Sequence, residues 1–155
     1  FLEHSQRQLP QLQQDDEWVA VAMVDIDHFK HINDSFGHDG GDEALRACAD
    51  AVAAHARSGD LVARFGGEEF CLMVPGLDPD AAVSYFEALR HAIAMLRVPI
   101  SDTTLRMTVS IGLCCLRPRR DSLHALITEA DRQLYLAKAG GRNRVCGANA
   151  AATAT

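Results

Sequence analysis

The chain has 155 residues, of which 48% are hydrophobic, and this composition suits one compact domain with a single core. The formal net charge of −6 argues against nucleic-acid binding, so local basic residues must meet any anionic ligand. No apolar run approaches the roughly 20 residues of a membrane span, and residues 1–5 turn polar too early for a signal peptide. The five cysteines lack a C-x-x-C pair, which indicates reduced thiols and a cytoplasmic domain.

The apolar periodicity predicts, in chain order, helix, strand, helix, helix, hairpin, helix, strand and helix. The adjacent Cys114 and Cys115 would point to opposite faces of their strand. The expected strands are 18–26, 61–65, 70–74 and 105–115. The expected helices are 1–14, bent by Pro10, then 29–36, 42–57, one that begins at Pro79 with Asp78 as its cap, and 122–139.

Two acidic turns follow buried strands. Gly66 and Gly67 predict a two-residue hairpin, because glycine reaches the positive φ angles that such turns need, and Glu68 and Glu69 follow at once. The first strand ends at Asp25. If the two strands are neighbours, these carboxylates converge on a hard cation such as magnesium. Taken one at a time, the turns have ordinary alternatives, a solvated hairpin and a strand end.

Together these turns and their surroundings resemble the GGDEF family, the diguanylate cyclases that make cyclic dimeric GMP (cyclic di-GMP) from two GTP. The family's turn stands at 66–70, with Glu68 in the Asp position. The pattern D-I-D-x-F-K-x-I-N-D-x-x-G-H-x-x-G-D runs unbroken over 25–42, and A-K-x-x-G-R-N-R-V over 137–145.

The resemblance predicts one GGDEF domain over residues 1–147, with a disordered tail over 148–155. It implies an α/β (α+β) sandwich whose central, mostly antiparallel five-stranded sheet is flanked by helices. This fold is related to the palm of nucleotidyl cyclases and polymerases. Periodicity alone does not predict that topology.

The resemblance also implies an active site of two metal ions, magnesium or manganese. Asp25, Glu68 and the backbone carbonyl of Ile26 would hold them, with Glu69 as a further ligand. Either Glu68 or Glu69 would help to deprotonate the attacking hydroxyl. Lys30 would place a positive charge on the phosphates, as such transfers require; without the motif it would be a solvated helix lysine.

Substrate contacts are implied at both ends of the motif set. Asn33, Asp42 and, less directly, His38 match the guanine-binding positions, where a carboxylate accepts from the N1 and N2 hydrogens. Helix capping is the ordinary alternative for Asn33 and Asp42. Lys138 and Arg142 match positions that contact the triphosphate, although basic residues near a helix C-terminus also favour the helix dipole.

The segment Arg57-Ser58-Gly59-Asp60, just before the hairpin, matches the family's inhibitory site for cyclic di-GMP. Arginine can meet guanine or phosphate with two hydrogen bonds, and aspartate accepts from guanine N–H groups. The ordinary alternative is a helix-end arginine and a turn aspartate. Arg90 would add a distal contact.

Two departures from the family concern the start of the chain. The family usually opens with a D-x-L-T-G-L-x-N-R-R segment and carries an N-terminal sensory or dimerising domain, and this chain starts just after that segment. One domain holds one GTP, so catalysis would need a homodimer. We expect a cytoplasmic domain that contacts neither nucleic acid nor membrane, although the full-length protein could be membrane-anchored.

Two other functions compete with the cyclase. A domain of this fold can bind GTP or cyclic di-GMP without making product, but such members usually lose acidic residues that this chain keeps at Asp25, Glu68 and Glu69. A cyclase that makes cyclic mononucleotides fits the guanine and R-x-x-D residues less well. The sequence therefore favours a diguanylate cyclase.

Overall fold

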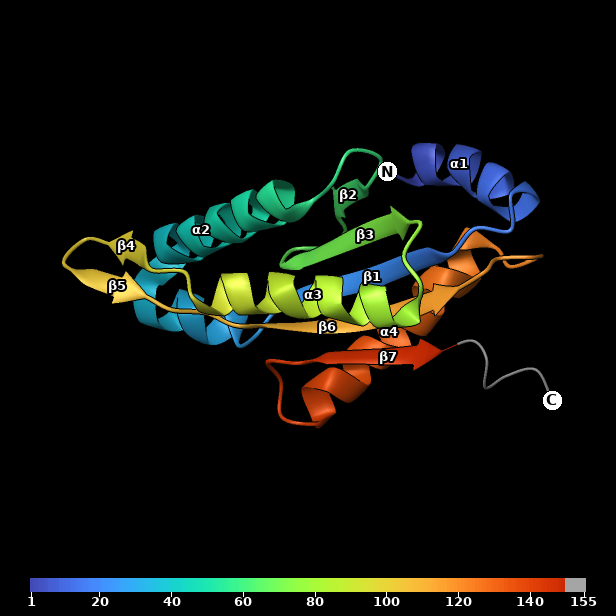
Figure 1. The fold of residues 1–155 in the computed structure, drawn as a ribbon. Helices are drawn as coiled ribbons and strands as arrows, with labels where there is room; N and C mark the ends of the chain where they lie inside the picture. The colour runs from blue at the N-terminus through green and yellow to red at the C-terminus, as the bar shows by residue number, and fades with distance from the viewer. Residues whose placement is uncertain (150–155) are drawn as a thin grey trace.

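Four helices and seven strands form within residues 1–149, the part of the chain that the computed structural model describes (Figure 1). The helices are α1 (Leu2–Gln14), α2 (Phe29–His55), α3 (Pro79–Ala94) and α4 (Leu123–Ala139). The strands are β1 (Val19–Ile26), β2 (Leu61–Arg64), β3 (Glu69–Pro75), β4 (Val98–Ile100), β5 (Thr103–Leu105), β6 (Val109–Leu116) and β7 (Val145–Asn149).

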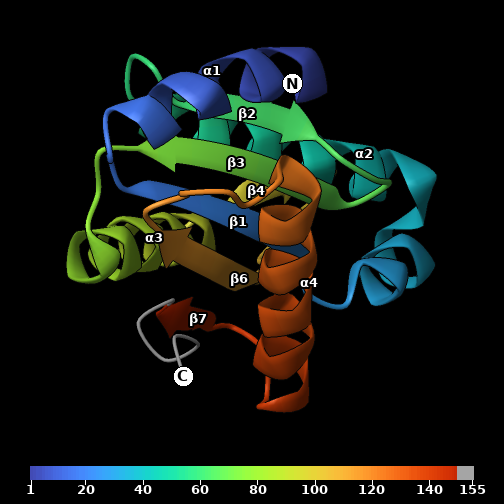
Figure 2. The ribbon, with the colours of Figure 1, turned by 90° about the vertical axis from the view of Figure 1, so that its right-hand side faces the viewer.

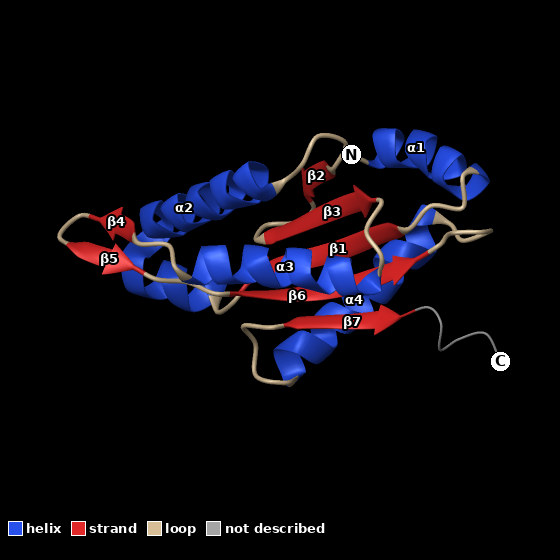
Figure 3. Ribbon diagram, viewed as in Figure 1, coloured by secondary structure: helices blue, strands red, loops and turns tan. Residues whose placement is uncertain are grey.

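Five strands form the central sheet in the order β2-β3-β1-β6-β7. All neighbours in this sheet are antiparallel except β6 and β7, which run parallel because α4 carries the chain back between them. The short strands β4 and β5 pair only with each other and form a ribbon apart from the sheet (Figure 3). The mixed α+β class and the mostly antiparallel five-stranded sheet are thus confirmed.

Both faces of the sheet are covered, and for this reason all 8 residues of β1 are buried. Helices α2 and α3 pack on the face that carries Ala20, Ala22 and Val24. Helices α1 and α4 pack on the other face, which carries Val21 and Met23 (Figure 2). This alternation is the side-chain period of a strand.

The same alternation separates the two adjacent cysteines of β6. Cys115 lies in the core under α2 and α3, whereas Cys114 lies in the core under α1 and α4. The prediction that they point to opposite faces is confirmed.

Three parts of the strand pattern differ from the prediction. The expected strand 105–115 is divided, since β5 ends at Leu105 and β6 begins only at Val109. Ribbon β4–β5 was not predicted either. A proline argues against a central strand, but Pro99 has a neighbour on one side only. Strand β7 was also not predicted, and it includes the first two residues of the expected tail; residues 150–155 lie outside the described part.

Helix α2 joins two segments that the sequence predicts separately. The chain kinks at Gly37, whose φ of 73° and ψ of 178° are not helical, and the second part of α2 begins directly after it. The predicted cap of α3 is confirmed, because the Asp78 carboxylate accepts from Ala81 N–H at 2.8 Å. None of the helices within residues 1–149 combines the length and the apolar character that crossing a membrane would take.

Candidate active site

The end of β1 and the start of β3 bring the predicted carboxylates together. In the antiparallel register Asp25 lies opposite Glu69. Ile26 N–H donates to the carbonyl of Glu68 at 3.3 Å, and this bond fixes the Glu68 backbone beside the end of β1. The expectation that these strands are neighbours is therefore confirmed.

The prediction of a two-residue turn between β2 and β3 is wrong. It spans residues 65–68, and the N–H of Phe65 donates to Glu69 O at 2.8 Å. Neither Gly66 nor Gly67 has a positive φ. Gly66 instead leaves room for the neighbouring carboxylate, because a Cβ there would lie 2.8 Å from Glu69 Oε2.

The side chain of Arg64, which was not among the predicted site residues, stabilises this turn through hydrogen bonds to its backbone. Its Nε donates to the carbonyl of Gly66 at 3.3 Å, and its Nη2 donates to that of Gly67 at 2.6 Å. The two glycine carbonyls are thus satisfied, and the acidic side chains remain available for a ligand. Its position directly before the turn was the only sequence signal.

Asp25 is the buried member of the acidic group and has a cationic partner. Its Oδ2 lies 3.1 Å from Lys138 Nζ, so the end of α4 reaches the end of β1. Burial raises the pKa of Asp25 to about 6, Lys138 opposes that shift, and Glu68 and Glu69 add to it. The charges of Glu68 and Glu69 therefore reach Asp25 through space.

These donors fit a magnesium-type ion. Carboxylates and a backbone carbonyl are the hard oxygen ligands that such an ion prefers, and it usually takes only one or two carboxylates beside water and phosphate. Within residues 1–149 no group of three or more His, Cys, Asp or Glu side chains is placed so that it could hold a metal ion. Lys138 places one positive charge against Asp25.

A pocket of about 480 Å³ lies beside the acidic turn, between the second part of α2 and the β2–β3 hairpin. Asp42 from α2 and Arg64 and Phe70 from the hairpin are among the residues that line it. A lining of both polar and apolar side chains suits a planar base, which has polar edges and apolar faces. Asp42, the predicted guanine-binding residue, thus lines a pocket.

The other residues expected at guanine lie along α2. Asn33 lies against Gly41, where a Cβ would come within 2.9 Å of Asn33 Cγ, so this glycine makes room for the amide. His38 is exposed just after the kink at Gly37 and does not line the pocket. The capping alternative is wrong, since Asn33 and Asp42 both lie inside α2.

Two of the predicted phosphate contacts lie at helix ends. We call the group of Asp25, Glu68 and Glu69 the acidic corner. Lys30 is exposed on the first turn of α2, two residues after β1 and its following turn. Arg142 follows α4 with a left-handed φ of 64°, and its N–H donates to Ala137 O at 3.0 Å. Lys30 follows Asp25 by five residues, and Arg142 follows Lys138, which contacts Asp25, by four.

Asp27 is a buried residue whose importance the sequence analysis missed. It accepts from Thr108 Oγ1 and Ser110 Oγ, both at 2.6 Å, and from Asn143 N–H at 3.0 Å. It thereby ties β1 to β6 and to the loop that carries Arg142. Its only sequence signal was the repeated aspartate, since strand alternation puts residues 25 and 27 on one face.

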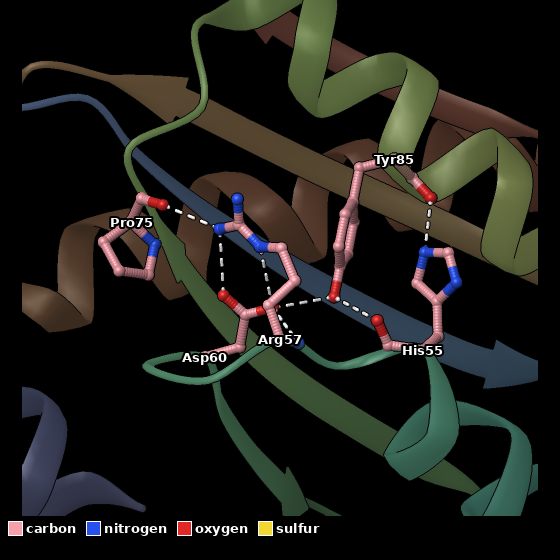
Figure 4. A network of polar contacts seen from close by, with 5 residues as sticks. All are labelled: His55, Arg57, Asp60, Pro75 and Tyr85. Carbon is pink, nitrogen blue, oxygen red and sulfur yellow. Dashed lines mark hydrogen bonds and ion pairs between the residues drawn. The ribbon is translucent and has the colours of Figure 1, made fainter.

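The R-x-x-D residues form a polar network at the other end of β3 (Figure 4). Arg57 donates from Nη2 to Asp60 Oδ1 at 3.0 Å and to the carbonyl of Pro75 at 2.8 Å. Tyr85 of α3 donates to Asp60 Oδ2 at 2.9 Å. Tyr85 was not predicted, and no local pattern could have shown it.

Arg90 lies outside this network. Its Nε donates to Glu87 at 2.7 Å, and its Nη1 donates to Asn143 Oδ1 at 2.8 Å. It therefore links α3 to the loop before β7. The structure brings Arg57 and Asp60 together but gives Arg90 other partners.

Comparison with known proteins agrees with this geometry. Residues 1–144 match the family described as "Diguanylate cyclase, GGDEF domain". The chain therefore belongs to the GGDEF family of diguanylate cyclases, whose enzymes depend on a metal.

Individual relatives are similar over most of the chain. The diguanylate cyclase DgcM of Escherichia coli is 45% identical over 129 residues, which are 83% of this chain and 30% of that protein. The GGDEF domain of DgcB from Caulobacter crescentus, solved with c-di-GMP, is 32% identical with a TM-score of 0.87, over 94% of this chain and 86% of that one. The GGDEF domain of YfiN from Pseudomonas aeruginosa is 31% identical with a TM-score of 0.89, over 96% and 94%. The chain spans about a third of the length of its full-length relatives, between 29% and 35%.

Proposed function

We propose that this domain condenses two GTP molecules into cyclic di-GMP and two pyrophosphates. The observation that carries the proposal is the β1–β3 register, which sets Asp25 against Glu69 beside a pocket lined by Asp42. An acidic corner for a metal–phosphate group and a pocket for a base then adjoin each other, as a nucleoside triphosphate requires.

In each step a ribose 3′-oxygen forms a bond to the α-phosphorus of the other GTP, and the bond to the bridging oxygen breaks to release pyrophosphate. Glu68 or Glu69 accepts the hydroxyl proton. Two bound magnesium or manganese ions would lower the pKa of that hydroxyl and neutralise phosphate charge. Asp25, Glu68, Glu69 and the Ile26 carbonyl would hold them.

Basic residues around the corner would bind the triphosphate. Lys30 is exposed at the start of α2, and Arg142 follows α4. Lys138 Nζ lies 3.1 Å from Asp25 Oδ2, so its charge is close to any metal–phosphate group that Asp25 would hold. In the pocket Asp42 would accept from guanine N1–H and N2–H, with Asn33 and His38 as further contacts along α2.

Catalysis would take two copies of the domain. The described residues contain one acidic corner and one adjoining pocket, which suffice for one GTP. A homodimer would set two such sites face to face. Because the full-length relatives are about three times longer, we also propose that an upstream sensory or dimerising domain controls this encounter.

Product analysis tests the proposal. Concentrated protein with GTP and magnesium should yield a product with the mass of cyclic di-GMP, and the Glu68→Ala/Glu69→Ala variant should yield none. A parent that binds cyclic di-GMP but makes no product at any concentration would instead identify a binding module. A cyclic mononucleotide would identify a different cyclase.

We further propose that Arg57 and Asp60 form a feedback site for the product, with Arg90 as a distal contact. The site lies at Pro75, whereas the acidic corner lies at Glu69, so the two are about 20 Å apart along β3. Product bound there would not block the corner of the same domain. Arg57→Ala should therefore keep turnover and lose inhibition by added cyclic di-GMP; inhibition equal to that of the parent would contradict the assignment.

A further inference from the structure

The Asp60 carboxylate is already occupied by hydrogen bonds from its own chain. Its Oδ2 accepts from Arg57 N–H at 2.8 Å, from Arg57 Nε at 3.3 Å and from Tyr85 Oη at 2.9 Å. Its Oδ1 accepts from Arg57 Nη2 at 3.0 Å. The side chain of Asp60 is 0% exposed, while that of Arg57 is 43% exposed.

This arrangement conflicts with recognition of guanine by both residues. The N1–H and N2–H groups of guanine are two parallel donors, and pairing them takes both oxygens of one carboxylate. A carboxylate oxygen offers about two lone pairs, and Oδ2 already serves three donors. Freeing a position on Oδ2 therefore takes the loss of two of its three donors. Arg57 Nε can leave when the exposed guanidinium turns to the ligand, and that turn also frees Oδ1 from Nη2. One more donor must then leave Oδ2.

Of the two donors that then remain on Oδ2, Tyr85 is the one that can leave without unfolding a turn. The Arg57 backbone N–H belongs to the turn that ends at Asp60, whose own N–H donates to Arg57 O at 3.1 Å. The Tyr85 hydroxyl comes from another element and has a second acceptor close by, the carbonyl of His55 at 3.4 Å. A rotation of the hydroxyl about the Cζ–Oη bond would exchange Asp60 for the His55 carbonyl as its acceptor (Figure 4).

The ring of Tyr85 is held in place while its hydroxyl has this choice. It packs edge-on against His55 with ring centroids 4.4 Å apart, and His55 Nε2 donates to the Tyr85 carbonyl at 2.9 Å. The Arg57 guanidinium lies over the ring, 5.5 Å from its centroid. Burial, followed by the bond to Asp60, raises the pKa of Tyr85, so the hydroxyl stays a donor at neutral pH.

We propose that Tyr85 is a latch on the inhibitory site, which competes with guanine for Asp60 and so sets the product concentration at which feedback begins. In the latched state Asp60 accepts from both Arg57 and Tyr85 and is covered. In the bound state the Arg57 guanidinium turns to the ligand, the Tyr85 hydroxyl turns to His55 O, and Asp60 accepts the guanine donors. The inference rests on the proposed function of Arg57 and Asp60 as a product site.

Calorimetric binding of cyclic di-GMP to Tyr85→Phe tests the latch. The variant keeps the ring and removes the competing hydrogen bond, so we expect binding tighter than that of the parent by about three- to tenfold. Tyr135→Phe is the matched control, because it removes the hydroxyl of the chain's other tyrosine, which is 70% exposed, and it should bind like the parent. Binding by Tyr85→Phe that is weaker than or equal to that of the parent would show that the hydroxyl supports the site or is idle, and would overturn the latch.

A second readout follows the hydroxyl itself. In the Tyr135→Phe background Tyr85 is the sole tyrosine, so a ¹³C-tyrosine label reports only on its Cζ. Added cyclic di-GMP should shift this resonance, since the hydroxyl exchanges a carboxylate for a carbonyl; an unmoved resonance at saturation would rule out the exchange.

The binding experiments involve no turnover, so they can contradict the proposed latch without contradicting the proposed cyclase activity. Arg57→Ala combined with Tyr85→Phe should lose binding. Retained binding by the double variant would place the ligand elsewhere and overturn both the feedback site and the latch. If neither the parent nor Tyr85→Phe binds, the latch is also wrong, because its removal exposes no site.

Discussion

At the scale of single residues, Asp27 shows how a side chain outside the reaction can hold the site together. Its buried carboxylate accepts from two hydroxyls of β6 and its flank, and from the backbone N–H of Asn143. Asn143 directly follows Arg142, so the carboxylate positions a proposed phosphate contact. The negative charge makes each of these bonds stronger than a neutral one.

We therefore expect Asp27→Ala to lower the free energy of unfolding by about 3 kcal/mol, since it strands buried donors. Ser110→Ala, which removes only one donor from the same cluster, should cost about 1 kcal/mol. Urea unfolding of both variants measures the difference. Equal costs would show that the carboxylate does not act as a shared acceptor.

At the scale of elements, α4 and β6 approach each other at Gly112. A Cβ there would lie 2.7 Å from Leu134 Cα and even closer to backbone atoms of Ala130 and Leu134, which cannot move aside without moving the helix. The close contact matters for function, because α4 also delivers Lys138 to Asp25.

Gly112→Ala should therefore lower the free energy of unfolding by about 3 kcal/mol or more, as expected for overpacking against backbone. Gly147→Ala on the neighbouring strand is the matched control, because its Cβ would make an ordinary contact 3.5 Å from Leu113. It should cost less than about 1 kcal/mol. Thermal unfolding of the pair tests this, and similar melting temperatures would contradict the close approach.

At the scale of the whole molecule, the core buries thiols on both faces of the sheet. Burial raises the pKa of Cys48, Cys71, Cys114 and Cys115 from 9.0 to about 12. At a pH between these two pKa values, the unfolded chain loses thiol protons that the native protein keeps. The native state is then stabilised at neutral pH and loses that advantage as pH rises above 9.

Stability should thus fall as pH rises from 9, by up to about 1.4 kcal/mol per thiol for each pH unit. Urea unfolding at pH 7, 9 and 10 measures the slope. Cys71→Ala removes one of these thiols and should give a shallower slope, whatever its effect at pH 7. A slope unchanged by this substitution would mean that the thiol does not contribute.

Much of the fold could be predicted because it is encoded locally. Apolar periodicity and caps such as Asp78 identify α1, α3 and α4, and the alternation in β6 places Cys114 and Cys115 on opposite faces. Strand β7 could not be predicted, since its short run of small residues becomes a strand only by pairing with β6. The ribbon β4–β5 could not be predicted either, because Pro99 argues against a strand unless that strand lies at an edge.

The sequence by itself determined the family and the acidic motifs, and it placed Asp25 and Glu68 at strand ends, because motif spacing and strand period are properties of short segments. Only the tertiary structure decided what each carboxylate contacts. It put Lys138 against Asp25 and Tyr85 against Asp60, pairs that come from different elements. Such partners follow from how helices pack on the sheet, and one sequence carries no local signal for a contact made across the fold.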